Sequence, residues 1–269
     1  MNLRANCKIN LGLDILRRRE DGFHDLETVM IPVAELYDEV EVERVEGDSV
    51  FEQTGLVVDC PAEKNLCMKA LRLMQQLYGV GNVRIRLDKR VPFGAGLGGG
   101  SSDATAVILA LNELFELGLS EERLVETAAM IGSDTAFFVR NTPQICRGRG
   151  EKMEPIELPL KGFYLAIAKP DEGVSTREAY AGVKPAIPQV RLKDALQRPV
   201  SEWNGVVKND FEPHIFALHP TIAELKQEML DAGAIYASMS GSGSAVFGIF
   251  ERKPKLDEKS NKYLILTQL

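Results

Sequence analysis

Hydrophobic and polar residues alternate strictly near the beginning of the chain. One set, at the odd positions from Ala5 to Ile15, is apolar, and the set between them comprises Asn6, Lys8, Asn10, Gly12 and Asp14. A period of two over eleven residues predicts a β-strand with one buried face. The second face aligns a cation, Lys8, with an amide, Asn10. Either a solvated outer face or a functional pair fits this pattern.

Other stretches show the same two kinds of periodicity. Strands are predicted over residues 28–33, 39–45, 83–87, 163–168 and 245–250. Apolar positions at helical spacing predict helices over residues 65–78, 104–115, 120–131 and 221–232, with glycines close behind them. This mixture of elements indicates an α+β protein.

A change of composition divides the chain. Gly148-Arg149-Gly150 and the stretch from Pro155 to Pro159 come after the helices of the first half. We therefore predict an N-terminal domain over residues 1–158 and a C-terminal domain over residues 159–269. Residues 184–199 are rich in proline and are expected to form a connector. The apolar segment 263–266 has no assignable role from its sequence.

The charge balance excludes some classes of partner. The 269 residues carry a net charge of −7, and the sequence pI is about 5.2. Such an acidic chain is unlike general nucleic-acid or anionic-membrane binders, although a local basic site for a phosphorylated ligand is allowed. No apolar run of eighteen residues and no signal-peptide pattern is present. We expect a cytoplasmic protein without a membrane or nucleic-acid partner.

The cysteines and histidines show no metal-binding spacing. The four cysteines are Cys7, Cys60, Cys67 and Cys146, and they form no C-x-x-C pair. With only three histidines in the chain, a zinc site is not predicted. Buried free thiols in a reducing compartment are the better interpretation.

The stretch from Pro92 to Asp103, Pro-Phe-Gly-Ala-Gly-Leu-Gly-Gly-Gly-Ser-Ser-Asp, lies between a predicted strand and a predicted helix. Backbone N–H groups of a glycine loop and a helix N-terminus together can hold a phosphate. Glycine allows the backbone to approach the anion closely. We expect Ser101 or Ser102 to cap the helix and Asp103 to lie in its first turn.

Three other interpretations of this loop can be weighed. Gly94, Gly96 and Gly99 match G-x-G-x-x-G, but a dinucleotide fold needs a second strand after the helix, and a second helix follows instead. A Walker A loop is excluded because no Lys-Ser or Lys-Thr follows the glycines. A loop without a ligand remains an alternative, although three consecutive glycines weaken a fold.

Three shorter stretches carry candidate chemistry. Asp21-Gly22 predicts a hairpin turn, and Phe23 and His24 beside it could stack on and hydrogen-bond to a flat heterocycle. In Gly132-Ser133-Asp134 either polar residue is a natural helix N-cap, so Asp134 could be only a cap. Residues 238–244 form a second glycine–serine loop, which could bind phosphate or be a plain turn.

Several of these blocks together resemble the GHMP kinases. Their signature loop, Pro-x-x-x-Gly-Leu-Gly-x-Ser-Ser, is similar to residues 92–102. The variant found here resembles one branch, the 4-diphosphocytidyl-2-C-methylerythritol kinases. Residues 5–11, 18–28, 132–138, 209–212 and 239–243 resemble further blocks of that branch, in the same order. The resemblance covers roughly residues 4 to 250.

The resemblance implies a two-domain fold and a reaction. The fold has an N-terminal mixed β/α domain and a C-terminal antiparallel-sheet domain with helices. The reaction converts ATP and 4-diphosphocytidyl-2-C-methylerythritol into ADP and the 2-phosphate, in the non-mevalonate route to isoprenoid precursors. Magnesium is expected to be bound mainly through the phosphates, without a dedicated protein metal site.

The resemblance also implies roles for single residues. Asp134 is expected to take the proton of the substrate hydroxyl, and Lys8 to hold Asp134 ionised and neutralise the γ-phosphate. The ATP phosphates are expected to lie against the loop formed by Pro92, Phe93, Gly94, Ala95, Gly96, Leu97, Gly98, Gly99, Gly100, Ser101 and Ser102.

For the substrate, Phe23 and His24 are expected to recognise cytosine, with Tyr180 as the second aromatic ring and Ser175 and Thr176 on the same loop. Asn10 is expected to contact the erythritol or its diphosphate. The branch often has tyrosine where Phe23 stands, a change that keeps stacking but removes a hydroxyl contact.

Two alternatives stay open beside this hypothesis. One is a GHMP kinase with another acceptor, such as mevalonate or homoserine. The other is a catalytically silent member of the fold that binds ATP or a metabolite as a sensor. Lys8 and Asp134 together argue against the sensor, and the Phe23-His24 turn argues against another acceptor. The pattern leaves a monomer and a homodimer equally open.

Overall fold

The computed structural model describes residues 1–57, 61–256 and 263–269. They form two compact units, each assembled from separate stretches of the chain. The first unit contains Met1–Lys8, Pro32–Phe93 and Gly98–Thr142, and the second contains Ile9–Ile31, Gly94–Leu97 and Pro143–Leu269. A single sequence boundary near residue 158 stays a prediction.

Two long strands, β1 (Asn2–Arg18) and β2 (His24–Arg44), pair with each other and supply residues to both units. The predicted turn joins them: the Arg19 N–H donates to the Phe23 carbonyl at 2.8 Å, and Gly22 has a φ of +85°. The prediction of two strands over residues 28–45 was wrong, because β2 is continuous. The alternation of buried and exposed residues along β2 is interrupted where Ala34 and Glu35 are both exposed. In the sequence this interruption resembles the end of a strand.

The first unit has a sheet covered by helices. β4 (Val83–Lys89) pairs antiparallel with Glu39–Arg44 of β2 and parallel with β3 (Val50–Gly55). Residues of β4 alternate between buried and more exposed positions, because one face meets the core. On the outer face Arg86 forms ion pairs with Glu41 and Glu52, each at 3.0 Å.

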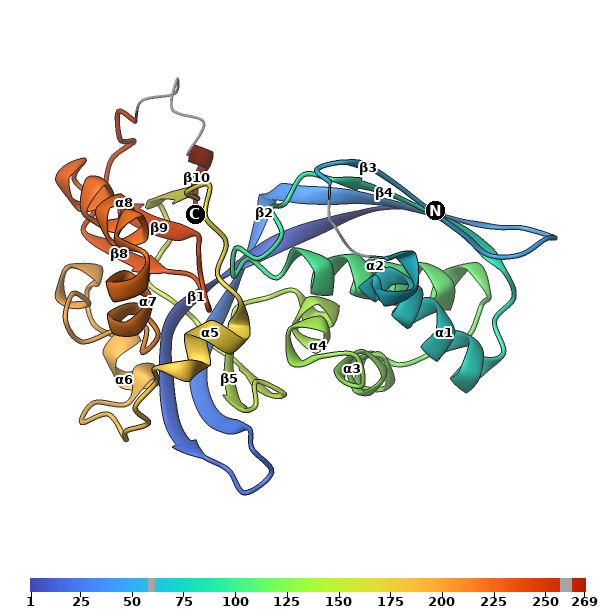
Figure 1. The fold of residues 1–269 in the computed structure, drawn as a ribbon, viewed down its shortest axis with the longest axis horizontal. Coiled ribbons are helices and arrows are strands. Elements are labelled where there is room, and N and C mark those ends of the chain that lie inside the picture. The colour runs from blue at the N-terminus through green and yellow to red at the C-terminus, as the bar shows by residue number, and fades with distance from the viewer. Residues whose placement is uncertain (58–60, 257–262) are drawn as a thin grey trace. The chain divides into compact units, whose positions relative to one another are not determined.

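The helices of the first unit lie together on one side of β3 and β4 (Figure 1). They are η1 (Ala62–Lys64), α1 (Leu66–Tyr78), α2 (Gly99–Leu114), α3 (Glu121–Ala129) and α4 (Ser133–Arg140). Gly79 ends α1 as predicted, Asn65 caps its start, and Ser120 caps α3. α2 is the central helix, since it packs against α1, α3 and α4 and ten of its sixteen residues are buried.

The start of α2 differs from the prediction. The helix begins at Gly99, its N-cap is Gly98 with a φ of +72°, and no side chain caps it. Ser101 and Ser102 therefore lie inside the helix, and Asp103 lies beyond its first turn. The low helix propensity of Gly99 and Gly100 hid these residues from the sequence pattern.

The start of α4 also corrects a prediction. Gly132 is the N-cap, and Ser133 is already helical. Neither Ser133 nor Asp134 makes a side-chain capping bond, so the Asp134 carboxylate does not serve as a cap.

The second unit contains a four-stranded antiparallel sheet in the order β10–β7–β9–β8. Its strands are β7 (Tyr164–Ala168), β8 (Tyr236–Met239), β9 (Val246–Phe250) and β10 (Tyr263–Gln268). The previously unassigned segment 263–266 is thus part of an edge strand. In the same unit, β5 (Gln144–Gly148) pairs with Leu26–Met30 of β2 and with β6 (Lys152–Pro155).

Helices complete the second unit: α5 (Thr176–Ala181), α6 (Leu192–Leu196), η2 (Val200–Glu202), α7 (Glu212–Leu218) and α8 (Pro220–Asp231). α8 packs against β8 and β9. The expected connector 184–199 includes α6, whose Leu192 and Leu196 are buried. Together the two units confirm the α+β class.

The polar face of β1 is not solvated. Asn6, Lys8, Asn10 and Asp14 are all buried. From sequence alone this face could be either a solvated surface or a functional one. In the structure it is covered by protein. Of the cysteines, Cys7, Cys67 and Cys146 are buried free thiols as predicted, and Cys60 lies outside the described residues.

A buried charge cluster connects the two ends of the glycine stretch in the first unit. The Lys89 ammonium pairs with Asp38 and, at 2.8 Å, with Asp103. Asp38 also accepts the N–H groups of Arg90 and Val91 at 2.6 and 2.7 Å. Burial opposes the charge on Lys89, but the two carboxylates outweigh burial and raise the Lys89 pKa. The cluster therefore fixes the backbone before the loop and the helix after it.

Lys89→Met tests this cluster. Removing the cation leaves two carboxylates buried without their counter-charge, so we expect a loss of about 3–5 kcal/mol in the free energy of unfolding. Arg90→Met is the matched control: its ion pairs are exposed, and we expect less than about 1 kcal/mol. Urea unfolding measures both, and equal effects of the two variants would contradict the assignment.

Candidate active site

An ion pair in the first unit joins the two predicted catalytic residues. The Lys8 ammonium of β1 lies 3.3 Å from an Asp134 carboxylate oxygen of α4. The Lys8 side chain is 3% exposed, whereas that of Asp134 is 35% exposed. The cation is therefore held by protein, while the carboxylate remains accessible to a ligand.

Neighbouring contacts hold α4 in place. The side-chain amides of Asn6 and Asn141 donate to each other, at 3.1 and 2.7 Å, so the residue two before Lys8 binds the far end of α4. The Thr105 hydroxyl of α2 donates to the carbonyl of Thr135 at 2.7 Å. Both ends of α4 are thus attached to neighbouring elements, and the position of Asp134 is well determined.

The glycine stretch approaches Lys8 directly. An added Cβ at Gly98 would lie 2.9 Å from Cε of Lys8 and 3.1 Å from the ring of Phe138. Together with its positive φ, this proximity requires glycine at that position. The first turn of α2 follows, and its N–H groups and the positive end of the helix dipole favour an anion. Residues 98–102 thus place a helix start, whose N–H groups and dipole favour an anion, beside the Lys8 side chain.

The second unit holds residues 94–97 against the other glycine–serine loop. The Ser240 hydroxyl donates to the Gly96 carbonyl at 3.0 Å, and the Ala245 N–H donates to the Ala95 carbonyl at 3.1 Å. An added Cβ at Gly96 would lie 1.9 Å from the Ser240 carbonyl oxygen. The close backbone packing explains why this position is glycine. Of the first two loop residues, Phe93 is 71% exposed and Pro92 is partly buried.

Asn10 belongs to the same arrangement. It is buried, its backbone N–H donates to the Ser240 hydroxyl at 3.2 Å, and its side-chain amide donates to Thr28 at 3.1 Å. Asn209 donates to the carbonyls of Met239 and Gly241, both at 2.8 Å, and so fixes the second loop. The sequence blocks containing these residues were recognised, but the roles of Asn209 and Ser240 in supporting the loop were not.

The hairpin turn presents an exposed aromatic ring. Phe23 is 52% exposed, and the Arg149 guanidinium lies 4.1 Å from the centre of its ring. This arrangement is a cation–π contact beside the turn. Arg149 was not predicted from sequence, where its one signal was a position between two glycines.

His24 and Tyr180 come together in the second unit. Their rings stack with centroids 4.9 Å apart and planes at 25°, and Phe211 meets Tyr180 edge-on at 4.8 Å. Ser175 caps α5 by accepting the Glu178 N–H at 3.2 Å, and Thr176 is exposed at the first position of this helix. The segment predicted to bind the base therefore lies beside His24.

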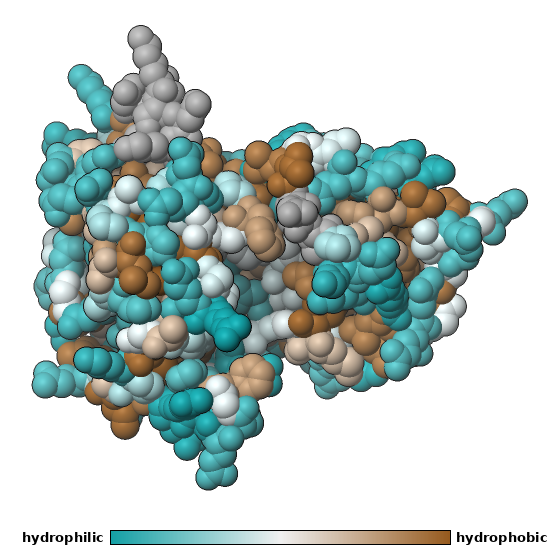
Figure 2. Space-filling view, in the orientation of Figure 1, coloured by the Kyte–Doolittle hydropathy of each residue, from teal (hydrophilic) through white to brown (hydrophobic). Residues whose placement is uncertain are grey.

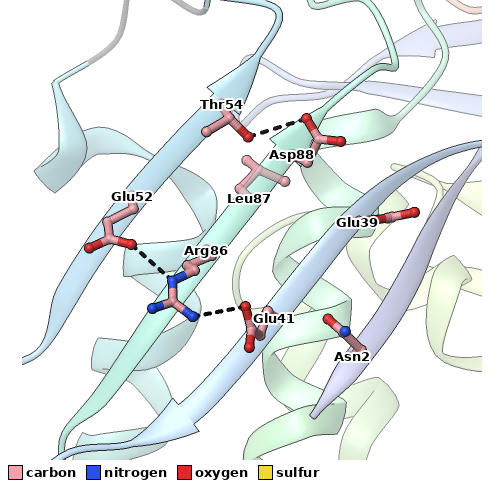
Figure 3. A pocket seen from close by; sticks show the side chains of 8 residues that line it. All are labelled: Asn2, Glu39, Glu41, Glu52, Thr54, Arg86, Leu87 and Asp88. Atoms are coloured by element: carbon pink, nitrogen blue, oxygen red, sulfur yellow. Dashed lines mark hydrogen bonds and ion pairs between the residues drawn. The ribbon is translucent and has the colours of Figure 1, made fainter.

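Two cavities lie outside these residues. One, of about 270 Å³, opens on the outer face of the first unit's sheet (Figure 3). Its carboxylates, Glu39, Glu41, Glu52 and Asp88, outnumber its guanidinium, Arg86, and two of them already pair with it. Such a surface repels phosphates, so it does not suit a nucleotide.

The other cavity, of about 460 Å³, lies in the second unit and is lined in part by Asp14, Lys208 and Asp210. Burial, followed by the nearby carboxylates of Asp210 and Glu27, raises the pKa of Asp14 to about 7. Asp210 itself accepts the Ile15 N–H at 2.7 Å, so it stabilises the fold.

Within residues 1–57, 61–256 and 263–269, no group of three His, Cys, Asp or Glu side chains is arranged to hold a metal ion. None of the helices in these ranges has both the length and the hydrophobicity needed to cross a membrane. On the face visible in Figure 2, hydrophobic residues form separate patches among hydrophilic ones.

Comparisons with known proteins agree with this geometry. Residues 65–142 match the model of the GHMP kinases N terminal domain, and residues 192–264 match that of the GHMP kinases C terminal. The 4-diphosphocytidyl-2-C-methyl-D-erythritol kinase of Bacteroides thetaiotaomicron is 48% identical over 94% of this chain and 93% of its own length. That of Parabacteroides distasonis is 45% identical, covering 95% and 93%.

Solved structures are similar as well. A crystal structure of 4-(cytidine 5'-diphospho)-2C-methyl-D-erythritol kinase superposes with a TM-score of 0.78 at 36% identity, covering 94% of this chain and 91% of the other. Homoserine kinase from Cytophaga hutchinsonii has a TM-score of 0.67 at 23% identity, covering 92% and 85%, and so shares the fold. The sequence blocks, the fold and these relatives together show that the chain belongs to the GHMP kinases, in the family of the 4-diphosphocytidyl-2-C-methyl-D-erythritol kinases.

Proposed function

We propose that this chain transfers the γ-phosphoryl group of ATP to the 2-hydroxyl of 4-diphosphocytidyl-2-C-methyl-D-erythritol, in the non-mevalonate route to isoprenoid precursors. The observation that carries the chemistry is the ion pair of a buried lysine with an accessible carboxylate beside a helix N-terminus. Close relatives bear the name of this activity, and the family uses ATP.

Asp134 is the proposed general base. Its carboxylate is free of a capping role and partly exposed, so it can accept the proton of the substrate hydroxyl. The hydroxyl oxygen then bonds to the γ-phosphorus, while the bond from that phosphorus to the ADP oxygen breaks. The proton remains on Asp134 until solvent removes it.

Lys8 has two proposed roles. Its ammonium at 3.3 Å favours the ionised form of Asp134, which is the form a base requires. It also directs positive charge toward the transferred phosphoryl group. This charge matters because phosphoryl transfer depends mainly on positioning and charge stabilisation. Because the side chain is buried and packed against Gly98, the ammonium is already in place before the ligands bind.

Residues 92–102 are proposed to hold the ATP phosphates through backbone N–H groups. Two observations support this proposal. An added Cβ at several of these glycines would collide with neighbouring atoms, and no side chain caps the first N–H groups of α2. Magnesium, carried by the phosphates, supplies charge neutralisation and draws its ligands mainly from phosphate oxygens and water. The chain's part is to position these groups.

The cytidine end is proposed to bind at the hairpin and α5. Phe23 offers an exposed face for stacking, and His24 offers ring nitrogens for hydrogen bonds. Tyr180, stacked on His24, is proposed as the second aromatic ring beside Phe23. Ser175 and Thr176 at the start of α5, and Asn10 on β1, are proposed to contact the remaining polar groups of the substrate.

The remaining proposals concern the setting of the reaction. We propose a cytoplasmic enzyme that acts on a small-molecule substrate without a nucleic-acid or membrane partner, as a monomer or homodimer.

The direct assay supplies ATP, magnesium and 4-diphosphocytidyl-2-C-methylerythritol and follows the products by ³¹P NMR. A new phosphomonoester together with ADP supports the proposal. ADP without that ester would replace it with another acceptor, to be sought among mevalonate, homoserine and sugars. ATP binding without any turnover would favour a sensor.

Asp134→Asn is expected to lower kcat by roughly 10²–10⁴-fold, because the amide cannot accept the proton. ATP affinity is expected to change little, whereas the midpoint of thermal unfolding is expected to fall, because the buried Lys8 ammonium loses its counter-charge. Asp48→Asn, at an exposed position, is the control for removing one negative charge. A decrease smaller than threefold would exclude Asp134 as the base.

Phe23→Ala is expected to raise KM for the cytidylyl substrate about ten- to one-hundred-fold, as loss of a stacked base costs roughly 1–3 kcal/mol. Phe93→Ala, which removes an exposed ring from the proposed ATP loop, is the matched variant and is expected to leave this KM nearly unchanged. An unaltered KM in Phe23→Ala would remove Phe23 from the cytidine site.

A further inference from the structure

A histidine outside the proposed site connects to two glutamates of the segment that carries Tyr180. His219 stands between α7 and α8, where its N–H donates to the Ile215 carbonyl at 2.8 Å and its carbonyl accepts the Ile222 N–H at 3.1 Å. Its Nδ1 lies 2.7 Å from Glu172 and its Nε2 lies 3.1 Å from Glu178. The ring is thus fixed by the helix junction and engaged on both of its nitrogens.

The two contacts determine the protonation that this geometry needs. An ionised carboxylate only accepts hydrogen bonds, so each ring nitrogen facing one must donate. A neutral imidazole has one donor and one acceptor nitrogen, and it would direct a lone pair at one of the glutamates. Two good contacts therefore require the doubly protonated, positively charged ring.

The glutamates belong to the segment that leads into α5. Glu172 is held further by the Thr221 hydroxyl at 2.6 Å, and its carbonyl accepts the Ser244 hydroxyl at 2.5 Å. Glu178 lies in the first turn of α5, two residues before Tyr180. His219 therefore contacts the segment at two points, one before α5 and one within it.

Other charged groups nearby do not replace His219. Lys169, at the end of β7, donates to the carbonyls of Pro170 and Glu172 at 2.7 and 3.2 Å, and these contacts leave the carboxylate of Glu172 to His219 and Thr221. The hydrogen bonds that the His219 ring donates to Glu172 and then to Glu178 raise the pKa of His219 above its ordinary value of about 6.5. Thr221 and then His219 lower the pKa of Glu172.

We propose that His219, in its doubly protonated form, is a positioning residue that fastens residues 172–180 to the α7–α8 junction and thereby sets the position of Tyr180 for the cytidylyl substrate. The inference rests on the proposed function for the identity of that substrate, but the proton-dependent contact itself does not. His219 touches no reacting atom in this account and acts only through the segment it holds.

The sign of the pH dependence follows from the raised pKa. Stabilisation of the segment by His219 is fully present below the ordinary pKa of histidine and is lost as pH rises through the raised folded-state value. Affinity for the cytidylyl substrate is therefore expected to fall over that interval, above about pH 6.5. The ATP phosphates are assigned to residues 92–102, so KM for ATP is expected to stay nearly constant.

The first test measures the ring directly, independent of any activity. In protein labelled with ¹⁵N-histidine, the nitrogen shifts of His24, His214 and His219 are followed from pH 5.5 to 9.5, with assignment by substitution. His219 is expected to remain doubly protonated past pH 6.5, and hydrogen exchange of residues 172–181 is expected to accelerate as it titrates. A neutral His219 ring at pH 6.5 overturns the proposal.

The second test compares variants by pH profile. In His219→Gln, KM for the cytidylyl substrate is expected to rise at least threefold at pH 6.5, to lose its dependence on this titration, and to leave kcat nearly unchanged. His214→Gln is the matched control, since that ring also packs on the end of α5, at Gly182, without an ion pair to either glutamate. It is expected to keep the wild-type pH profile.

Glu172→Gln and Glu178→Gln each remove one negative charge beside the His219 ring and are each expected to lower the His219 midpoint in the NMR titration. An unchanged pH dependence of KM in His219→Gln overturns the positioning role. If wild-type protein does not phosphorylate the cytidylyl substrate, the proposed function fails, while the NMR and hydrogen-exchange results still decide whether the histidine contact exists.

Discussion

The requirement to pair a buried cation organises the first unit. Lys8 is almost completely buried on β1, and a lysine in that position needs a counter-charge. Asp134 supplies it from the first turn of α4, and contacts at Asn141 and Thr135 keep that helix against β1 and α2. The same pair places a partly exposed carboxylate beside a fixed ammonium, which is the geometry on which the proposed phosphoryl transfer rests.

Glycine makes this arrangement sterically possible. At Gly98 a side chain would collide with the stem of Lys8, and at Gly96 it would collide with the backbone of the second glycine–serine loop. Each position also has a positive φ, which glycine adopts without strain. The glycines thus permit close packing within each unit, which offsets their conformational cost.

The second unit shows how polar contacts organise a region built of short elements. α5 has six residues, too few for a stable isolated helix, and so it depends on its surroundings. Ser175 caps it, Tyr180 packs between His24 and Phe211, and the glutamates before and within it contact His219. Ala179 is also buried in the core, so polar contacts and apolar packing together hold this short helix.

Sequence by itself determined whatever depends on local pattern. Alternation predicted β1, helical spacing predicted α1, α3 and α8, and the glycine stretch indicated a phosphate loop, because dihedral preferences and periodicity are properties of neighbouring residues. Local pattern gave wrong predictions at two places. Gly99 and Gly100 are helical despite their low helix propensity, and β2 continues through an interruption in its alternation of buried and exposed residues. Only the tertiary structure decided that the polar face of β1 is buried, that Asp134 is not the cap of α4, and that Arg149 lies over the Phe23 ring. Each of these contacts joins residues far apart in the chain, and such contacts depend on how whole elements pack, which no short stretch of sequence encodes.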